Sequence, residues 1–287
     1  MSRIALLLVT LFFAQTTKPE TVRPMLWQPE MKPSDVGEIN VFRRFPRELR
    51  DKMVQFYEQV LGIKPLPGTA LGGNNAQRQR DSAQPQTMIR YPIGGSEVKL
   101  FPVAMGDPNR ARPVRDVIGI RLLTFFFPDE ASVAARFKQH GYPAPVFRSN
   151  TALVQDPDGQ WVELIIVPGA PASTYSRFEI GMTVSDIEKS RAFYRDFVGM
   201  DEERPAQHPV LGTTKYSYRS GATTINLWSF GKDLPKDTNS AGIQYITWDV
   251  VAVDRVAKAR NATIDRPLSA PGPTRTVWLF DPDQITN

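Results

Sequence analysis

The chain repeats itself, and this repeat limits the fold more than any other feature of the sequence. Asp-Pro-Asp follows an apolar run twice, in "LVQDPDGQWVELI" (153–165) and in "VWLFDPDQITN" (277–287). Three further pairs of segments match in the same order: 53–63 with 190–200, 96–103 with 223–230, and 119–127 with 242–250. The two copies of each pair lie at nearly constant separation along the chain, which indicates a duplicated domain.

Each half divides again into two smaller units. In the second half, "FEIGMTV" predicts a strand, and 185–199 predicts a helix capped by Ser185 or Asp186. The alternating runs 214–220 and 223–230, joined by Gly221, predict a hairpin. A strand at 242–250, a helix at 252–261 and further strands follow, and the first half has a matching helix at 129–141. The predicted unit is β-α-β-β-β, used four times in an α+β chain.

The length of 287 residues is sufficient for two such domains, which we place at 38–168 and 176–287. Residues 1–16 carry one early cation and an apolar run that suits a signal peptide and is too short for a bilayer. Residues 17–37 are Pro-rich and read as a linker. The absence of cysteine fits an exported protein of the bacterial periplasm or the extracellular space, with no membrane contact after cleavage.

The net charge of +5 is mildly basic. The densest basic stretch, 42–52, is interrupted by Glu48 and Asp51 and lacks the interleaved aromatic pattern of a nucleic-acid groove. We therefore expect no nucleic-acid partner.

The four units, the Phe-Tyr helix that ends in Leu-Gly or Val-Gly, and the Asp-Pro-Asp-Gly turn together resemble the vicinal oxygen chelate superfamily. That superfamily includes glyoxalase I, extradiol dioxygenases and bleomycin-resistance proteins. "VSDIEKSRAFYRDFVGM" (184–200) and "VQDPDGQWVEL" (154–164) carry the resemblance most specifically. It implies that pairs of units form curled-sheet cups, each of which can hold a divalent metal through one inward residue on each of four strands.

The resemblance places the inward residues by their distance from the family motifs. The metal-ligating glutamate of the family matches Glu163, and its usual first ligand matches Glu179. With one cup per half, the first cup would present Glu38 or Asn40, Lys99, Leu122 and Glu163. The second cup would present Glu179, Asn226 and Tyr245, with the fourth position beyond the last residue.

These residues disfavour the usual metal centre of the family. A catalytic metal needs about three donors of His, Asp, Glu or Cys type. His140 ends a helix far from either cup, and we expect His208 in a solvated loop, although it could lean over the second cup as a base or a stray ligand. No cofactor is therefore expected. Zinc, nickel, manganese or iron at Glu163 is the alternative.

Other roles follow for the inward residues. Lys99 could form a salt bridge with Glu163 or hold a polar ligand group. Glu179 and Tyr245 could act as general base and acid, with Asn226 orienting a carbonyl. Trp161 and Trp228 would then line the cups with aromatic walls for a flat ligand, although all of these side chains equally suit an ordinary core.

Three functions remain open. The first is binding of a small organic ligand without chemistry, as the bleomycin-resistance branch implies. The second is a metal-dependent lyase, isomerase or dioxygenase of glyoxalase type, with ring cleavage the least favoured. The third is an interaction module with vestigial sites. The sequence also leaves open whether the cups close within one chain or with a second copy in a homodimer.

Overall fold

The computed structural model describes residues 39–66, 69–70, 87–170, 177–221, 223–237, 240–247, 249–272 and 275–287. The predicted signal peptide, the predicted linker and Glu38 lie outside these residues.

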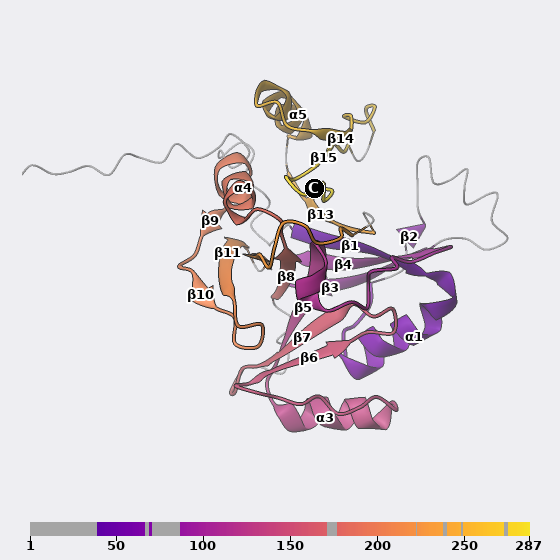
Figure 1. Cartoon of the computed structure of the whole chain (residues 1–287). Coiled ribbons are helices and arrows are strands. Elements are labelled where there is room, and N and C mark those ends of the chain that lie inside the picture. The colour runs from indigo at the N-terminus through magenta and orange to yellow at the C-terminus, as the bar shows by residue number, and fades with distance from the viewer. Residues whose placement is uncertain are drawn as a thin grey trace, which may run out of the picture.

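Four successive units of strand, helix and further strands build the described chain, as the sequence predicts (Figure 1). Unit 1 contains β1 (Ile39–Pro46), η3 (Arg47–Leu49), α1 (Arg50–Val54), η4 (Gln55–Val60), β2 (Thr69–Ala70), β3 (Thr87–Ile93) and β4 (Ser96–Val103). Unit 2 contains η5 (Val114–Asp116), β5 (Gly119–Phe127), α3 (Glu130–Gln139), β6 (Thr151–Gln155) and β7 (Trp161–Ile166). Unit 3 contains β8 (Phe178–Thr183), α4 (Ile187–Arg191), η6 (Ala192–Phe197), β9 (Asp201–Glu202), β10 (Ala206–Gln207), β11 (Thr214–Ser220) and β12 (Thr223–Trp228). Unit 4 contains β13 (Ala241–Tyr245), α5 (Val250–Ala259), β14 (Ile264–Arg266) and β15 (Trp278–Leu279).

Short-range chemistry sets the helix boundaries. Asp129, Asp186 and Asp249 each occupy the N-cap of a helix and accept a hydrogen bond from a backbone N–H three residues later. The Phe-Tyr helices of units 1 and 3 each pass into a π-helical turn, η4 and η6, before a glycine in the left-handed region ends them. No helix in the described part of the chain is long and apolar enough to cross a membrane.

Each of the two main sheets combines strands from both halves of the chain. In the five-stranded sheet, here the small sheet, β1 of unit 1 pairs antiparallel with β13 of unit 4. In the eight-stranded sheet, here the large sheet, β5 of unit 2 pairs antiparallel with β8 of unit 3. The sequence left the pairing of the units open, and the structure pairs unit 1 with unit 4 and unit 2 with unit 3. The inward residues that were assigned on the assumption of one cup per half therefore lie on two different sheets.

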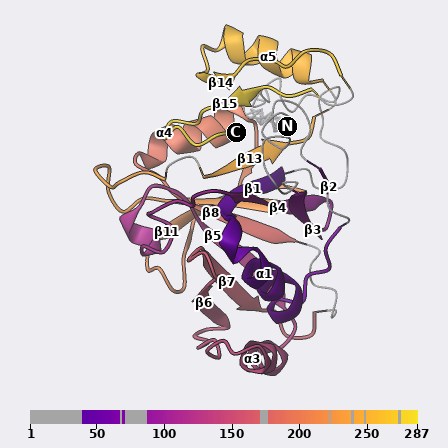
Figure 2. The same ribbon diagram turned by 90° about the vertical axis from the view of Figure 1, so that its right-hand side faces the viewer.

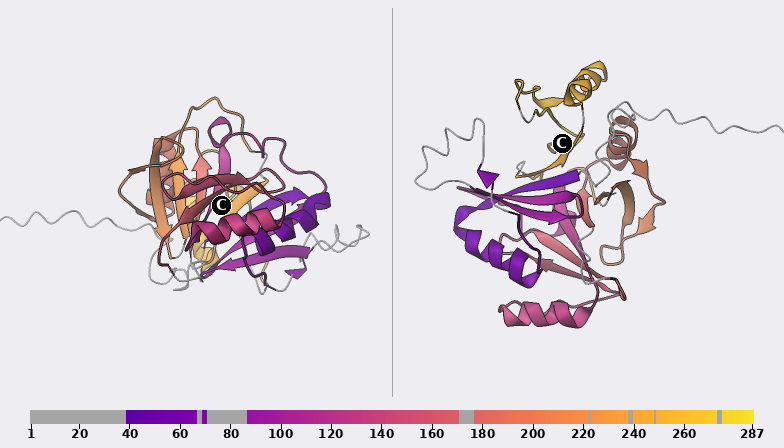
Figure 3. Two further views of the ribbon diagram at one scale, coloured as in Figure 1. Left: turned by 90° about the horizontal axis from the view of Figure 1, so that it is seen from below. Right: turned by 180° about the vertical axis from the view of Figure 1, so that it is seen from behind.

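The arrangement is visible from several sides. Figures 1 and 2 place α5, β14 and β15 at one end of the molecule and α3 at the other. From behind, the violet strands of unit 1 lie between the yellow elements of unit 4 and the magenta strands of unit 2 (Figure 3). The main core is continuous through both halves and includes Phe56, Phe125, Ile180 and Tyr218.

Both Asp-Pro-Asp turns connect the last strand of a half to the Phe-Tyr helix of the same half. Oδ2 of Asp156 accepts a hydrogen bond from the Tyr57 hydroxyl at 3.1 Å, and Oδ2 of Asp281 accepts one from Tyr194 at 3.1 Å. The other oxygen of each aspartate accepts two backbone N–H groups of its own turn. The repeated motif is thus a structural clamp that joins the two units of a half.

Candidate functional site

The inner face of the large sheet brings the predicted acids of both halves together. Glu163 on β7 and Glu179 on β8 both pair with Thr124 on β5, so the two glutamates share a face with one strand between them. At the next position on the same face, two residues away on each strand, Trp161 and Gly181 both pair with Leu122. We call Glu163, Glu179, His208, Asn226 and Trp228 the large-sheet site.

His208 lies over this face and contacts Glu163. Its Nε2 is 3.2 Å from Oε1 of Glu163, and its Nδ1 accepts the backbone N–H groups of Val210 (3.2 Å) and Leu211 (3.1 Å). Because Nδ1 is an acceptor, the proton of the neutral ring is on Nε2, which donates to Glu163. The second carboxylate oxygen of Glu163 accepts the Thr124 hydroxyl at 2.8 Å.

The expectation that His208 lies in a solvated loop is therefore wrong. Only 3% of the His208 surface is exposed, and its ring meets the indole of Trp228 edge-on with centroids 5.4 Å apart. Its position depends on the turn between β10 and β11, which Gly212 closes through a hydrogen bond from its N–H to the carbonyl of His208. The large-sheet location of this loop depends on the pairing of β8 with β5, which local sequence patterns do not encode.

Glu179 forms a more accessible polar group beside the Glu163–His208 pair. Oε2 of Glu179 accepts Nδ2 of Asn226 at 2.6 Å and lies 3.6 Å from Nζ of Lys215. Oδ1 of Asn226 in turn accepts the Ser217 hydroxyl at 2.7 Å, which fixes the amide orientation. The side chain of Glu179 is 15% exposed and that of Lys215 is 25% exposed, so this end of the site contacts solvent.

Aromatic and apolar side chains complete the face. Trp228 packs with Leu122, Val114 and Leu211, and Trp161 borders this cluster. Gly181 makes room for the indole, since a Cβ there would lie 2.4 Å from Cη2 of Trp228. The prediction that Trp161 and Trp228 share strand faces with Glu163 and Asn226 agrees with the observed registers, and both tryptophans border one site.

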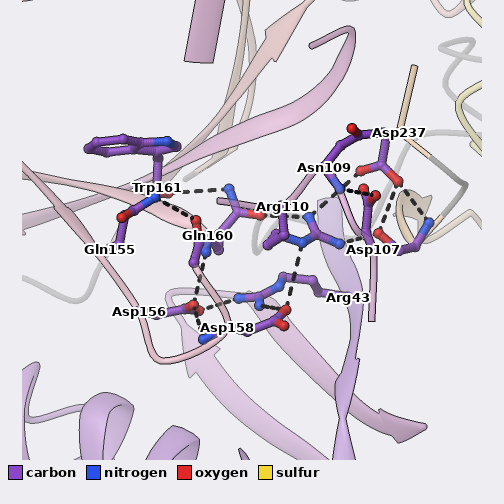
Figure 4. A network of polar contacts seen from close by, with 12 residues as sticks. Arg43, Asp107, Asn109, Arg110, Gln155, Asp156, Asp158, Gln160, Trp161 and Asp237 are labelled. Atoms are coloured by element: carbon purple, nitrogen blue, oxygen red, sulfur yellow. Dashed lines mark hydrogen bonds and ion pairs between the residues drawn. The ribbon is translucent and has the colours of Figure 1, made fainter. Parts of the chain in front are cut away.

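A buried ionic network supports the Trp161 side of the site (Figure 4). The Arg43 guanidinium lies between Asp156, with which it forms a short ion pair, and Asp158, whose Oδ2 is 2.5 Å from Nη2. Burial lowers the pKa of Arg43, but the two aspartates and Tyr57 outweigh burial and raise it overall. For Asp158, burial outweighs the effect of Arg43 and raises the pKa.

The same network holds the loop before β5. Nη1 of Arg110 donates to Gln160 at 2.8 Å, and Nη2 of Arg121 donates to the carbonyl oxygens of Asn109, Arg110 and Arg112. The carbonyl of Arg112 also accepts the indole N–H of Trp161 at 2.9 Å. Burial lowers the pKa of Arg121 to about 10. The network therefore fixes the loop against which Trp161 rests.

The structure does not bring Glu163 and Lys99 together. Lys99 lies on the small sheet, where Nζ donates to Oε1 of Gln244 at 2.9 Å. The predicted salt bridge is wrong because β4 and β7 belong to different sheets.

Tyr245 also lies away from Glu179. On β13 it is Gln244, opposite Asn40, that shares the face of Lys99, while Tyr245 points into the core and its hydroxyl donates to Oδ1 of Asn287 at 3.2 Å. The prediction aligned the Gly-Ile pair at the start of β5 with the Gly-Ile pair of β13. This alignment placed Tyr245 on the wrong face, because β5 has an irregularity between Ile120 and Leu122. The proposed acid–base pairing of Glu179 with Tyr245 is therefore not formed.

A metal centre of the usual kind does not fit these residues. Across the described ranges, no three His, Cys, Asp or Glu side chains are grouped as a metal site requires. Glu163 and His208 provide one donor pair, but both ring nitrogens of His208 are already hydrogen-bonded within the protein.

Comparisons with known proteins agree with this architecture. The family described as "Glyoxalase/Bleomycin resistance protein/Dioxygenase superfamily" matches residues 49–164 and 178–287. Glyoxalase I from Zea mays superposes with a TM-score of 0.63 at 22% identity, covering 88% of this chain and 90% of that one. A putative dioxygenase from Bacillus subtilis subsp. subtilis str. 168 gives a TM-score of 0.62 at 12% identity, covering 87% and 83%. No curated protein matches the chain. At these identities the solved structures share the fold, and they carry no further argument about activity.

Proposed function

Because the chain belongs to the glyoxalase/bleomycin resistance protein/dioxygenase superfamily, we propose that it binds a small organic ligand on the inner face of its large sheet. The main support is that polar and aromatic side chains from both halves of the chain lie together on one face. Glu163 comes from the first half, whereas Glu179, His208, Asn226 and Trp228 come from the second.

The composition of the site favours a ligand with hydrogen-bond donors and a flat apolar part. Glu163 and Glu179 are acceptors when ionised. Lys215 lies 3.6 Å from Oε2 of Glu179, and Arg115 borders the site through its hydrogen bond to the carbonyl of Leu211. The carboxylate oxygens of this face suit hydroxyl, amide N–H or amine groups of a ligand. The indoles of Trp161 and Trp228 offer a surface for a ring.

The loop between β10 and β11 controls how far such a ligand can enter. In the described state His208 fills the space over Glu163, while Glu179 and Lys215 remain partly exposed. A ligand that reaches Glu163 must displace His208 and break the Nε2–Oε1 contact. A ligand that stays at Glu179 leaves the loop in place.

One observation favours the metal-dependent lyase or isomerase as a second candidate. Glu163 and His208 have the side-chain types that such enzymes use as ligands, and they are in contact. The donor set of the described residues falls short of three, so ligand binding without the usual metal centre stays our first proposal.

Ligand binding is tested by thermal unfolding of the full chain with a panel of neutral, cationic and anionic small molecules. A compound that raises the melting temperature of the wild type should lose this effect in Glu179→Gln. It should keep the effect in Glu188→Gln, a matched change at an exposed helix position. Equal shifts in both variants would contradict binding at this face.

The metal alternative is tested separately by native mass spectrometry of untagged protein. One equivalent of zinc, nickel, manganese or iron that disappears in Glu163→Ala would favour the lyase or isomerase. Protein without metal in both forms would favour the binding function.

A further inference from the structure

The small sheet has a polar and aromatic face of its own, formed by β1, β4 and β13. Asn40 and Phe42 on β1 pair with Gln244 and Gly242 on β13, and Phe42 also pairs with Lys99 on β4. These side chains therefore lie on one face. We call Phe42, Lys99, Phe101, Gln244 and Trp278 the small-sheet face.

Lys99 is the cation at the centre of this face. Its side chain is 17% exposed, and burial lowers the pKa of its ammonium group. Among the described residues, Nζ makes one hydrogen bond, to Gln244 at 2.9 Å, and lies 3.9 Å from Oε2 of Glu97. An ammonium group has three donors, so donor capacity remains for an acceptor on this face.

Glu97 does not neutralise Lys99 fully because it is shared. Nε of Arg90 donates to Oε2 of Glu97 at 2.8 Å, and Nη2 contacts the other oxygen. The cluster of Arg90, Glu97 and Lys99 therefore carries one net positive charge.

Three aromatic rings that contact one another lie on the face of Lys99, with Phe42 opposite Lys99 on the neighbouring strand. The ring of Phe42 meets Phe101 edge-on at 6.2 Å and Trp278 edge-on at 5.6 Å between centroids. Gly242 makes this possible, since a Cβ there would lie 2.4 Å from Cε1 of Phe42. Phe101 and Trp278 stay partly exposed, so flat apolar surface lies beside the ammonium group.

We propose that the small-sheet face binds an anionic aromatic molecule, with its carboxylate on Lys99 and its ring against Phe101 and Trp278. A carboxylate would accept the free donors of Nζ and would compensate the net charge of the cluster. At the edges, Arg44 lies over the Phe42 ring (5.6 Å), and Arg266, which is paired with Asp265 at 4.0 Å, lies over the Trp278 ring (5.9 Å). This site is independent of the function proposed for the large sheet.

The test uses 1-naphthoate as the anionic probe and 1-naphthamide as its neutral match, measured by saturation-transfer NMR and calorimetry on the full chain. We expect naphthoate to bind at least about tenfold more tightly than naphthamide, since only the former pairs with Lys99. Lys99→Met should weaken naphthoate binding about tenfold or more. Lys189→Met, at an exposed position of α4 outside both faces, should leave it unchanged. Acetate, which has no ring, should bind more weakly than naphthoate.

Three results would each overturn the proposal: no naphthoate binding to the wild type, equal binding of the amide, or equal loss in Lys99→Met and Lys189→Met. Acetate that binds as tightly as naphthoate would remove the aromatic part of the claim and overturn it as stated. Circular dichroism of both lysine variants verifies that a loss of binding is not a loss of fold. If Lys99→Met fails to fold, Lys99→Gln, which keeps a hydrogen-bond donor without the charge, should give the same loss of naphthoate binding.

Discussion

At the residue scale, one exchange separates the two Asp-Pro-Asp clamps. Arg43 on β1 contacts Tyr57 and Asp156, whereas Met182 has the corresponding place on β8 and contacts the hydroxyl of Tyr194. Asp156 is therefore paired with a buried cation. Asp281 is enclosed without one in its immediate hydrogen bonds among the described residues, and burial raises its pKa to about 7.

The raised pKa of Asp281 predicts a pH dependence of stability. The folded state holds this proton more tightly than the unfolded state, so its contribution is greatest below pH 4 and decreases as the pH rises through about 7. Asp281→Asn keeps a neutral side chain at all pH values and should flatten the decrease in unfolding free energy between pH 5 and 8. Urea unfolding across this range measures it. The exposed control Asp233→Asn should keep the pH dependence of the wild type. The same pH dependence in Asp281→Asn would contradict this assignment.

The two turns also differ at their fourth residue. Gly159 has φ of +82° and Gln284 has φ of +66°, so a side chain occupies the left-handed region only in the second turn. Gln284→Gly should stabilise the chain by about 0.5–1 kcal/mol, because removing the strain exceeds the entropy that glycine adds to the unfolded state. Gly159→Ala should destabilise it, since its Cβ would lie 2.7 Å from Cβ of Ala111. Chemical denaturation should therefore give changes in unfolding free energy of opposite sign for the two variants. Changes of the same sign would argue against strain at Gln284.

At the element scale, the Arg43 network attaches β1 to the turn between β6 and β7. Removal of Arg43 leaves Asp156 buried without its cation, and leaves Asp158 with Arg110 alone, whose Nε is 3.7 Å from Oδ2. We predict that Arg43→Met lowers the unfolding free energy by about 3–5 kcal/mol.

The exposed control Arg50→Met should cost less than about 0.5 kcal/mol. Combining Arg43→Met with Asp158→Asn should recover part of the loss, because one of the two buried carboxylates that lost Arg43 is made neutral. Equal effects of Arg43→Met and Arg50→Met in urea unfolding would show that the network contributes little.

Local elements were predictable from the sequence, and their partners were not. The hairpin around Gly221, the Asp186 cap and the Asp-Pro-Asp turns depend on short spacings, and each lies where the pattern predicts. The prediction for Tyr245 was wrong because of the irregularity in β5. A shift of one residue moves the matching side chain to the other face of the strand, and no sequence motif marks such a shift. The burial of His208 could not be predicted, because it requires units 2 and 3 to share a sheet.

At the scale of the whole molecule, the two halves complete one another. β1 and β5 of the first half pair with β13 and β8 of the second, so neither half closes its own sheets. We predict that residues 38–170 expressed alone expose two strand edges and self-associate, with β1 of one copy beside β5 of another. Light scattering coupled to size-exclusion chromatography measures this. A stable monomer would contradict the observed pairing of the units.

The contact between Glu163 of the first half and His208 of the second is central to this account, because it defines the large-sheet site. The chain contains only two histidines, so ¹⁵N-histidine NMR above pH 7.5 reports on His208 directly, with His140→Asn providing the assignment. The account predicts a neutral His208 ring with its proton on Nε2, and an Nε2 resonance that shifts in Glu163→Gln. A mixture of tautomers that is unchanged by Glu163→Gln would contradict it.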